Sequence, residues 1–203
     1  MITPIAIAVA YVLFLCWHEP WFVRRLRPGE AVAILGGAYD DLTVAERERF
    51  VAFMDGDDGR PFYMVNLMEY RERADYRPGT ALNGSTPTGI ISGRDAGWLY
   101  TRAVLPELFR RGCYPVFVAG KLTNLLSAGA GTDFFADVAI VRYRSRRDML
   151  SLVASPAFRH AVPHKWASLE RTVAVPCRRL LLVDPAALVP LVLIATLLLM
   201  RLG

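Results

Sequence analysis

The hydrophobic residues are unevenly distributed along the chain, and its longest uncharged apolar stretches lie at the two ends. Neither Ile2–Trp17 nor Pro185–Met200 contains a charged residue. A helix rises about 1.5 Å per residue and needs about 20 residues to cross a bilayer core of about 30 Å. Each stretch therefore reaches this length only if residues next to it are included. With that extension, residues 1–23 and 180–203 are predicted to be N-terminal and C-terminal transmembrane helices.

Two alternatives stay open for these ends. The first is a cleaved secretory signal, which begins with positive charge and ends in small residues. No Lys or Arg precedes Tyr11, and the bulky run Cys16–Glu19 (CWHE) follows the apolar stretch, so a retained anchor is favoured. The second alternative is an apolar helix that docks on the folded domain.

Arginines gather where both apolar ends join the rest of the chain, at Arg24, Arg25, Arg27, Arg178 and Arg179. Cytoplasmic flanks of membrane helices carry an excess of basic residues, so this pattern predicts a cytoplasmic domain with both termini across the membrane. Contact of these arginines with anionic headgroups accounts for the formal charge of +5. Membrane lipids are therefore expected partners, and no nucleic-acid partner is expected.

Between the ends, residues 24–59 are predicted to form a linker with an amphipathic helix, and residues 60–177 a folded domain. Thr43 and Glu46 have the spacing of a capping box, which predicts a helix that runs to about Met54. The apolar run at 31–35 is typical of either a strand or a segment on a membrane surface.

The predicted domain alternates strand-like and helix-like runs. Runs rich in β-branched and aromatic residues predict strands at 62–68, 115–122, 136–143 and 171–175. Apolar periodicity and capping residues predict helices at 97–111, 145–149 and 156–170. Residues 69–95 are rich in Gly, Pro, Ser and Arg and are predicted to be a long loop. The order β-α-β-β-α-β is that of a ferredoxin-like α+β domain.

Four segments of this domain resemble a domain-of-unknown-function family in the dimeric α/β-barrel superfamily. The segments are Tyr63–Leu67 (YMVNL), Tyr114–Gly120 (YPVFVAG), Asp137–Ser145 (DVAIVRYRS) and Ser155–Phe158 (SPAF). The resemblance covers about residues 60–176. It implies a homodimer in which two ferredoxin-like protomers pair their sheets into a barrel with an internal pocket. Members of the superfamily include cofactor-free enzymes and proteins that only bind ligands, so the fold does not select one function.

Two histidines are the candidate catalytic residues. His160 and His164 are four residues apart, and either imidazole is suited to proton transfer near neutral pH. Pro163 lies between them and removes a backbone donor, which threatens the helix that would align them. No HExxH pattern or Cys pair completes a ligand set, so neither a metal site nor another cofactor is predicted.

The candidate ligand-binding residues are Asn66, Tyr100, Arg142 and Tyr143. Asn66 interrupts an apolar strand, where its amide must find hydrogen-bond partners. Arg142 and Tyr143 are adjacent in a strand and are predicted to point to opposite faces. The chain's two lysines, Lys121 and Lys165, have no neighbouring motif that indicates a Schiff base.

The sequence therefore predicts a membrane-anchored, dimeric domain that binds a small apolar molecule, with cofactor-independent catalysis as an extension of that role. The alternative is a non-catalytic accessory or scaffold subunit of a larger membrane complex. Whether the domain is an enzyme stays open at this level, because no residue pattern names a reaction.

Overall fold

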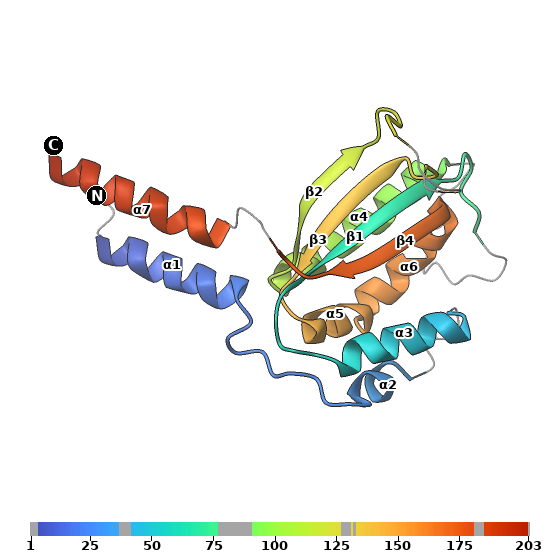
Figure 1. Cartoon of the computed structure of the whole chain (residues 1–203), viewed down its shortest axis with the longest axis horizontal. Helices are drawn as coiled ribbons and strands as arrows, with labels where there is room; N and C mark the ends of the chain where they lie inside the picture. The colour runs from blue at the N-terminus through green and yellow to red at the C-terminus, as the bar shows by residue number, and fades with distance from the viewer. Residues whose placement is uncertain are drawn as a thin grey trace.

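The computed structural model describes residues 4–36, 42–76, 91–126, 131, 133–180 and 185–202. The part between the two ends is an α+β domain, as predicted (Figure 1). In order along the chain, the helices and strands are α1 (Pro4–His18), α2 (Glu30–Leu35), α3 (Val44–Asp55), β1 (Phe62–Tyr70), α4 (Gly93–Arg110), β2 (Tyr114–Gly120), β3 (Asp137–Tyr143), α5 (Arg146–Val153), α6 (Pro156–Ser168), β4 (Leu169–Cys177) and α7 (Pro185–Leu202).

The four strands form one antiparallel sheet in the order β2-β3-β1-β4. All four predicted strands are present, with ends that differ from the expectation by a few residues. Most of the predicted loop at 69–95 lies outside the described residues, while its first two residues belong to β1 and its last three to α4. The designation ferredoxin-like, and with it the dimeric α/β-barrel assignment, stays a prediction.

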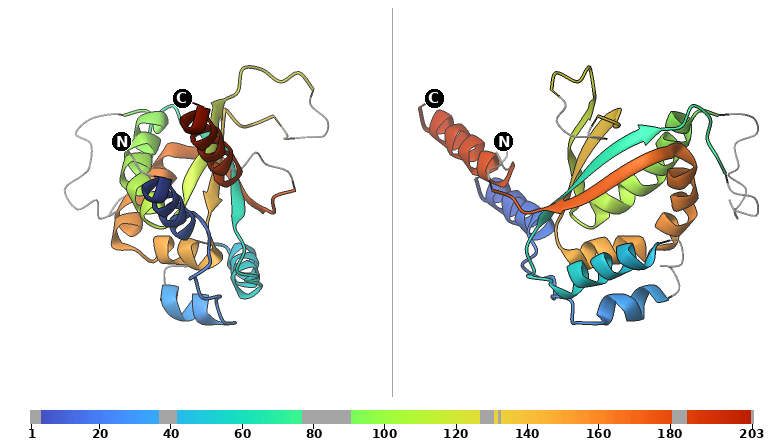
Figure 2. Two further views of the ribbon diagram at one scale, coloured as in Figure 1. Left: turned by 90° about the vertical axis from the view of Figure 1, so that its left-hand side faces the viewer. Right: turned by 45° about the vertical axis from the view of Figure 1, so that its right-hand side comes forward.

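Helices cover one face of the sheet, and the other face is open. Helices α4, α5 and α6 lie on the covered face, as the views in Figures 1 and 2 agree. The cluster beneath them joins Val104 and Leu108 of α4 to Leu152 of α5 and Ala161 of α6, with Tyr143 of β3 packed against it. A second cluster joins α2 and α3 to α5 through Ala31, Met54 and Leu150.

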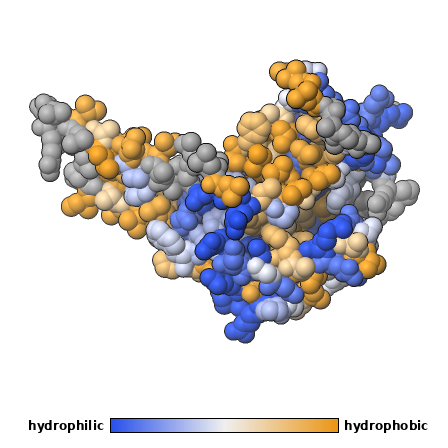
Figure 3. All heavy atoms as spheres, viewed as in Figure 1, coloured by the Kyte–Doolittle hydropathy of each residue, from blue (hydrophilic) through white to orange (hydrophobic). Residues whose placement is uncertain are grey.

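The open face of the sheet has a patch of apolar side chains (Figure 3). Residues directly opposite each other in antiparallel strands point to the same side, and successive residues alternate. Because Tyr143 points toward the helices, the strand register places the following side chains on the open face: Val65, Leu67, Phe117, Val138, Ile140, Val173 and Val175. Phe117, Val173 and Val175 are between 41% and 51% exposed.

Local sequence explains where several helices begin. Thr43 and Glu46 form the predicted capping box at the start of α3, with the Thr43 hydroxyl accepting from the Glu46 amide. Ser92 and Asp95 form a second capping box, so α4 begins four residues before the predicted start. The run at 31–35, left undecided between strand and membrane-surface segment, is the short helix α2.

The two terminal helices lie side by side, away from the sheet (Figures 1 and 2). Helix α1 has 15 residues and α7 has 18, and α7 contains Pro190. At about 1.5 Å per residue they extend about 22 and 27 Å, which is less than the bilayer core of about 30 Å.

In the part of the chain that the structure describes, no helix combines the length and the apolar character that crossing a membrane requires. The predicted transmembrane helices, and with them the membrane localisation with both termini across the bilayer, are therefore wrong. The C-terminal end of α1 instead contacts the folded domain, since His18 is completely buried there.

Candidate functional site

Three of the predicted ligand-binding residues lie on the helix-covered side of the sheet. Tyr143 of β3 stacks on Phe62 of β1, with ring centroids 5.2 Å apart. Asn66 has the same orientation as Phe62 because it lies four residues along β1. Tyr100 faces the same interior from α4, where its ring meets Phe158 of α6 edge-on at 6.1 Å. Asn66, Tyr100 and Tyr143 therefore lie between the sheet and the helices that cover it.

Lys165 completes this set. It lies on α6, four residues beyond Ala161, so both point to the same apolar side of the helix. Its ammonium nitrogen lies 5.9 Å from the centroid of the Tyr100 ring and 5.1 Å from that of Trp166. We refer to Lys165, Tyr100 and Tyr143 as the Lys165 site.

Burial controls the ionisation of all three groups. It raises the pKa of Tyr100 and of Tyr143, and the neighbouring Tyr100 phenol raises the pKa of Tyr143 further. Both phenols therefore carry their protons at neutral pH. Burial also lowers the pKa of Lys165, because the charged ammonium loses solvation and gains no anionic neighbour.

The three side chains are hydrogen-bond donors that lack acceptors. Among the described residues, the Lys165 ammonium lies against two ring faces, and neither it nor either phenol hydroxyl forms a hydrogen bond or ion pair. In those same ranges, the side-chain atoms that are fully enclosed and unpartnered are the Nε atoms of Arg71, Arg142 and Arg146. The donors of the Lys165 site are not in this group, so they keep some contact with solvent. Their unmet donors are available to a ligand.

Asn66 hydrogen-bonds within the sheet, and its predicted role in ligand binding stays a prediction. Its amide nitrogen donates to the carbonyl oxygens of Met64, at 3.1 Å, and Ala139, at 3.2 Å. Both acceptors belong to the sheet, so the side chain ties β1 to β3. The amide oxygen remains available as an acceptor on the side of the Lys165 site.

The two candidate catalytic histidines lie in different surroundings. Helix α6 continues through Pro163, yet His160 is exposed while His164 is buried. The Nδ1 atom of His164 lies 2.7 Å from the hydroxyl of Tyr76, and burial lowers the His164 pKa. No group of three His, Cys, Asp or Glu side chains is placed to hold a metal ion within the described ranges.

Arg142 lies on the opposite side of the sheet from Tyr143, as predicted, in a cluster with the end of α1. Its guanidinium lies 3.4 Å from Nδ1 of His18 and 3.5 Å from Glu19, and donates to the Gly112 carbonyl at 3.3 Å. His18 also contacts Glu19 at 2.7 Å and the Tyr114 hydroxyl at 2.8 Å. Arg142 therefore fastens α1 to the sheet and is separated from the Lys165 site by the sheet itself.

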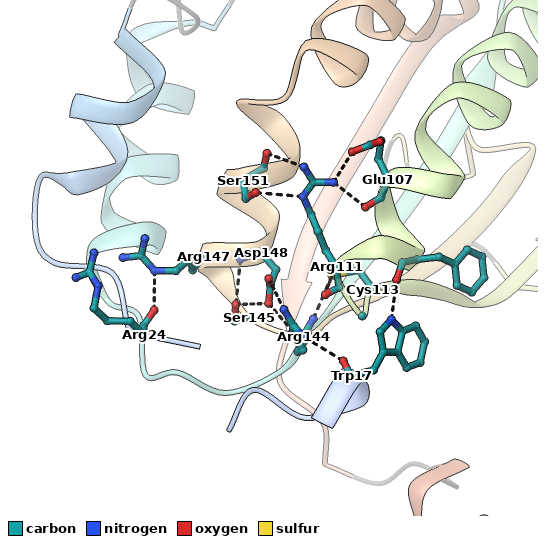
Figure 4. Close-up of polar contacts among 12 residues, drawn as sticks. Trp17, Arg24, Glu107, Arg111, Cys113, Arg144, Ser145, Arg147, Asp148 and Ser151 are labelled. Atoms are coloured by element: carbon teal, nitrogen blue, oxygen red, sulfur yellow. Dashed lines mark hydrogen bonds and ion pairs between the residues drawn. The ribbon is translucent and has the colours of Figure 1, made fainter. Parts of the chain in front are cut away.

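Further contacts secure the same end of α1 (Figure 4). The indole of Trp17 donates to the Phe109 carbonyl at 2.7 Å, and the Trp17 carbonyl accepts from Arg144 at 3.2 Å. Arg144 is itself held by a two-point ion pair with Asp148, both contacts at 2.8 Å. These bonds bring α1, α4 and α5 together, and they support a structural role for this region.

An open hollow of about 430 Å³ lies between α6 and the edge strand β4. Val162, Pro163 and Leu169 contribute apolar lining, and Arg71 and Glu170 form an ion pair at its margin. Trp166 lines the hollow and also faces the Lys165 ammonium. The indole thus borders the hollow and lies next to Lys165.

Sequence reasoning missed several of these residues. No motif surrounds Lys165, but its helical spacing from Phe158 and Ala161 places it on their apolar stripe and indicates that it faces the interior. His18 lies within the predicted N-terminal transmembrane helix, whereas the structure buries it against the folded domain. The pairing of Tyr76 with His164 joins residues 88 positions apart, and no local pattern indicates it.

Comparisons with known proteins indicate relatives of the fold. No protein-family model matches the chain, and no curated protein matches it significantly. The solved structure of the methylated RPA0582 protein is similar, with 25% identity and a TM-score of 0.57, over 71% of this chain and 96% of that one. The structure of RPA0582, a protein of unknown function from Rhodopseudomonas palustris, gives 25% identity and a TM-score of 0.56, over 70% and 97%. These likenesses assign no activity.

Proposed function

We propose that this protein binds a small organic molecule at the Lys165 site, between the sheet and helices α4 and α6. The observation that carries the proposal is the Lys165 ammonium, which lies against the rings of Tyr100 and Trp166 and lacks an anionic or hydrogen-bonding partner among the described residues. A partly desolvated cation without a protein partner is costly, and a ligand that supplies an oxygen acceptor lowers that cost.

The surroundings define the ligand class. Tyr100, Tyr143 and Lys165 present donors, so the ligand carries a carbonyl or carboxylate oxygen. Phe158, Trp166 and the rings of the two tyrosines present apolar faces, so the body of the ligand is apolar and small. The Asn66 amide oxygen offers one acceptor to a donor group elsewhere on the ligand.

A matched set of benzene derivatives tests this specificity. Benzoate and acetophenone carry the acceptor, and toluene has the same ring without it. We expect both oxygenated compounds to raise the melting temperature and to bind in calorimetry, with toluene at least about tenfold weaker because it leaves the donors unpaired. Equal binding of toluene and acetophenone would contradict the proposal.

The variant Tyr143→Phe removes one hydroxyl and keeps the ring that stacks on Phe62. Since a net hydrogen bond contributes about 1 kcal/mol, acetophenone should bind about fivefold more weakly to this variant. Tyr11→Phe, in α1, serves as the control and should leave the affinity unchanged. Unchanged acetophenone binding by Tyr143→Phe would remove Tyr143 from the site.

We also propose that the protein acts as a homodimer that pairs the open faces of two sheets. The face has an apolar patch, and its charged residues Glu69 and Arg171 form an ion pair at 2.6 Å, so these two charges compensate each other when a second copy approaches. A two-fold interface places the same patch on both sides, which suits a neutral apolar face. The resemblance to the dimeric α/β-barrel superfamily leads to the same expectation.

Light scattering tests the dimer. Val175 is 45% exposed on the open face, so Val175→Lys should fold and yet give a monomer, because it places a charge inside the interface. Val44→Lys, at a position that is 73% exposed on α3, is the matched control and should remain dimeric. A monomeric native protein would refute this arrangement.

A further inference from the structure

The two lysines of the chain have contrasting surroundings. Lys121 follows β2, and its ammonium donates to the carbonyl oxygen of Asp133 at 2.7 Å. Lys165 is partly buried against the rings of Tyr100 and Trp166, and in the described part of the chain its amine forms no hydrogen bond and no ion pair. The two amines should differ in reactivity, because the Lys121 ammonium is hydrogen-bonded to a carbonyl oxygen whereas the Lys165 amine lies against apolar rings.

An amine attacks a carbonyl carbon only when it is unprotonated. Desolvation without a counter-ion favours the neutral amine, and it is one of the ways in which proteins activate lysine. Burial lowers the pKa of Lys165 by this route. The absence of an ion pair has a second consequence, since no carboxylate among the described residues has to be displaced before the nitrogen can react.

We propose that Lys165 is a nucleophile that forms a Schiff base with a small aldehyde or ketone. The inference rests on the proposed function, because it assigns a carbonyl compound and a covalent step to the same site. Lys165 is placed for this reaction by its partial access to solvent and by the apolar rings of Tyr100 and Trp166, which pack against the body of the substrate.

The reaction balances without a redox partner. The Lys165 nitrogen forms a bond to the carbonyl carbon, the carbonyl oxygen takes up a proton, and the nitrogen loses one, which gives a carbinolamine. The hydroxyl then leaves as water with a second proton as the carbon–nitrogen double bond forms. Tyr100 and Tyr143 are the neighbouring protonated groups and hydrogen-bond the carbonyl oxygen during the attack.

Trapping with borohydride tests the proposal on the full chain. The protein is incubated with benzaldehyde near neutral pH and reduced with sodium borohydride, which converts an imine into a stable benzyl amine. Intact mass spectrometry counts the benzyl groups, and a digest locates them. We expect Lys165 to be labelled about tenfold or more faster than Lys121, and Lys165→Arg to lose this label while Lys121→Arg keeps it.

The outcomes separate the Schiff-base proposal from the proposed binding function. Fast, selective labelling of Lys165 supports the Schiff base. Equal labelling of both lysines, or a label at the amino terminus alone, overturns it. If benzoate and acetophenone bind but benzaldehyde gives no adduct at Lys165, the binding function stands and the Schiff base falls. If no compound binds and no adduct forms, both proposals fail. Circular dichroism of Lys165→Arg establishes that the variant is folded.

Discussion

Substitution of Gly112 by alanine should release the end of α1 from the domain. Gly112 precedes β2 and has a φ of +66°, in the left-handed region where residues with a Cβ are strained. A Cβ at this position would also overlap the carbonyl oxygen of Trp17. Because that atom is backbone, the overlap is relieved only if the last turn of α1 moves away.

The expected loss has two parts. The left-handed backbone conformation costs about 1 to 2 kcal/mol for a residue with a side chain. Displacement of Trp17 breaks its bond to the Phe109 carbonyl and the bond that its own carbonyl accepts from Arg144, at about 1 kcal/mol each. The stacking of Trp17 on Tyr114, at 5.8 Å, adds about 0.5 to 1 kcal/mol. We expect Gly112→Ala to lower the free energy of unfolding by about 3.5 to 5 kcal/mol.

Gly29→Ala is the matched control. Gly29 has a φ of +77°, and nothing lies within 4 Å of the Cβ that alanine would add. This variant therefore reports the backbone cost alone, about 1 to 2 kcal/mol. Urea denaturation of both variants, followed by tryptophan fluorescence, measures the difference. Equal destabilisation by the two substitutions would refute the docking of α1 on the domain.

Three further predictions concern ionisable side chains. Lys165→Met should raise the free energy of unfolding of the ligand-free protein by about 1 kcal/mol, since it removes a desolvated ammonium. Lys121→Met should change the free energy of unfolding by no more than about 0.5 kcal/mol, and urea denaturation compares the two variants. Arg142→Met should lower the free energy of unfolding by about 2 kcal/mol, because it removes a buried guanidinium that donates to the Gly112 carbonyl and pairs with the partly exposed Glu19; an unchanged midpoint would contradict this. His164 has a lowered pKa in the folded state, so the stability that it contributes is complete above its ordinary value of 6.5 and is lost as the pH falls from that value through the lowered folded-state pKa. The pH dependence of the melting temperature should therefore be flatter in His164→Gln and unchanged in His160→Gln.

The sequence by itself determined the features that arise from short-range chemistry. The capping box at Thr43 and Glu46 predicts α3 because both partners lie within one helical turn. The faces of a strand are accessible in the same way, since alternation along β3 requires Arg142 and Tyr143 to face opposite sides. The second capping box, at Ser92 and Asp95, is equally local and marks the start of α4.

The terminal segments show the limit of composition. Uncharged apolar runs are typical of membrane helices and also of helices that pack on each other or on a domain. Whether the run that ends at His18 crosses a bilayer depends on its helical length and on what surrounds its last turn. Contacts with Tyr114 and Arg142, about 100 positions away along the chain, decide the second point.

The Lys165 site was decided only by the tertiary structure. A lysine within an apolar helical stripe has the same local sequence whether the stripe faces solvent or a sheet. Desolvation, which sets the ionisation of Lys165 and of Tyr100, depends on how α4 and α6 pack together over β1 and β3. Local sequence therefore determined which elements form, whereas long-range packing determined which side chains lose their water and become available to a ligand.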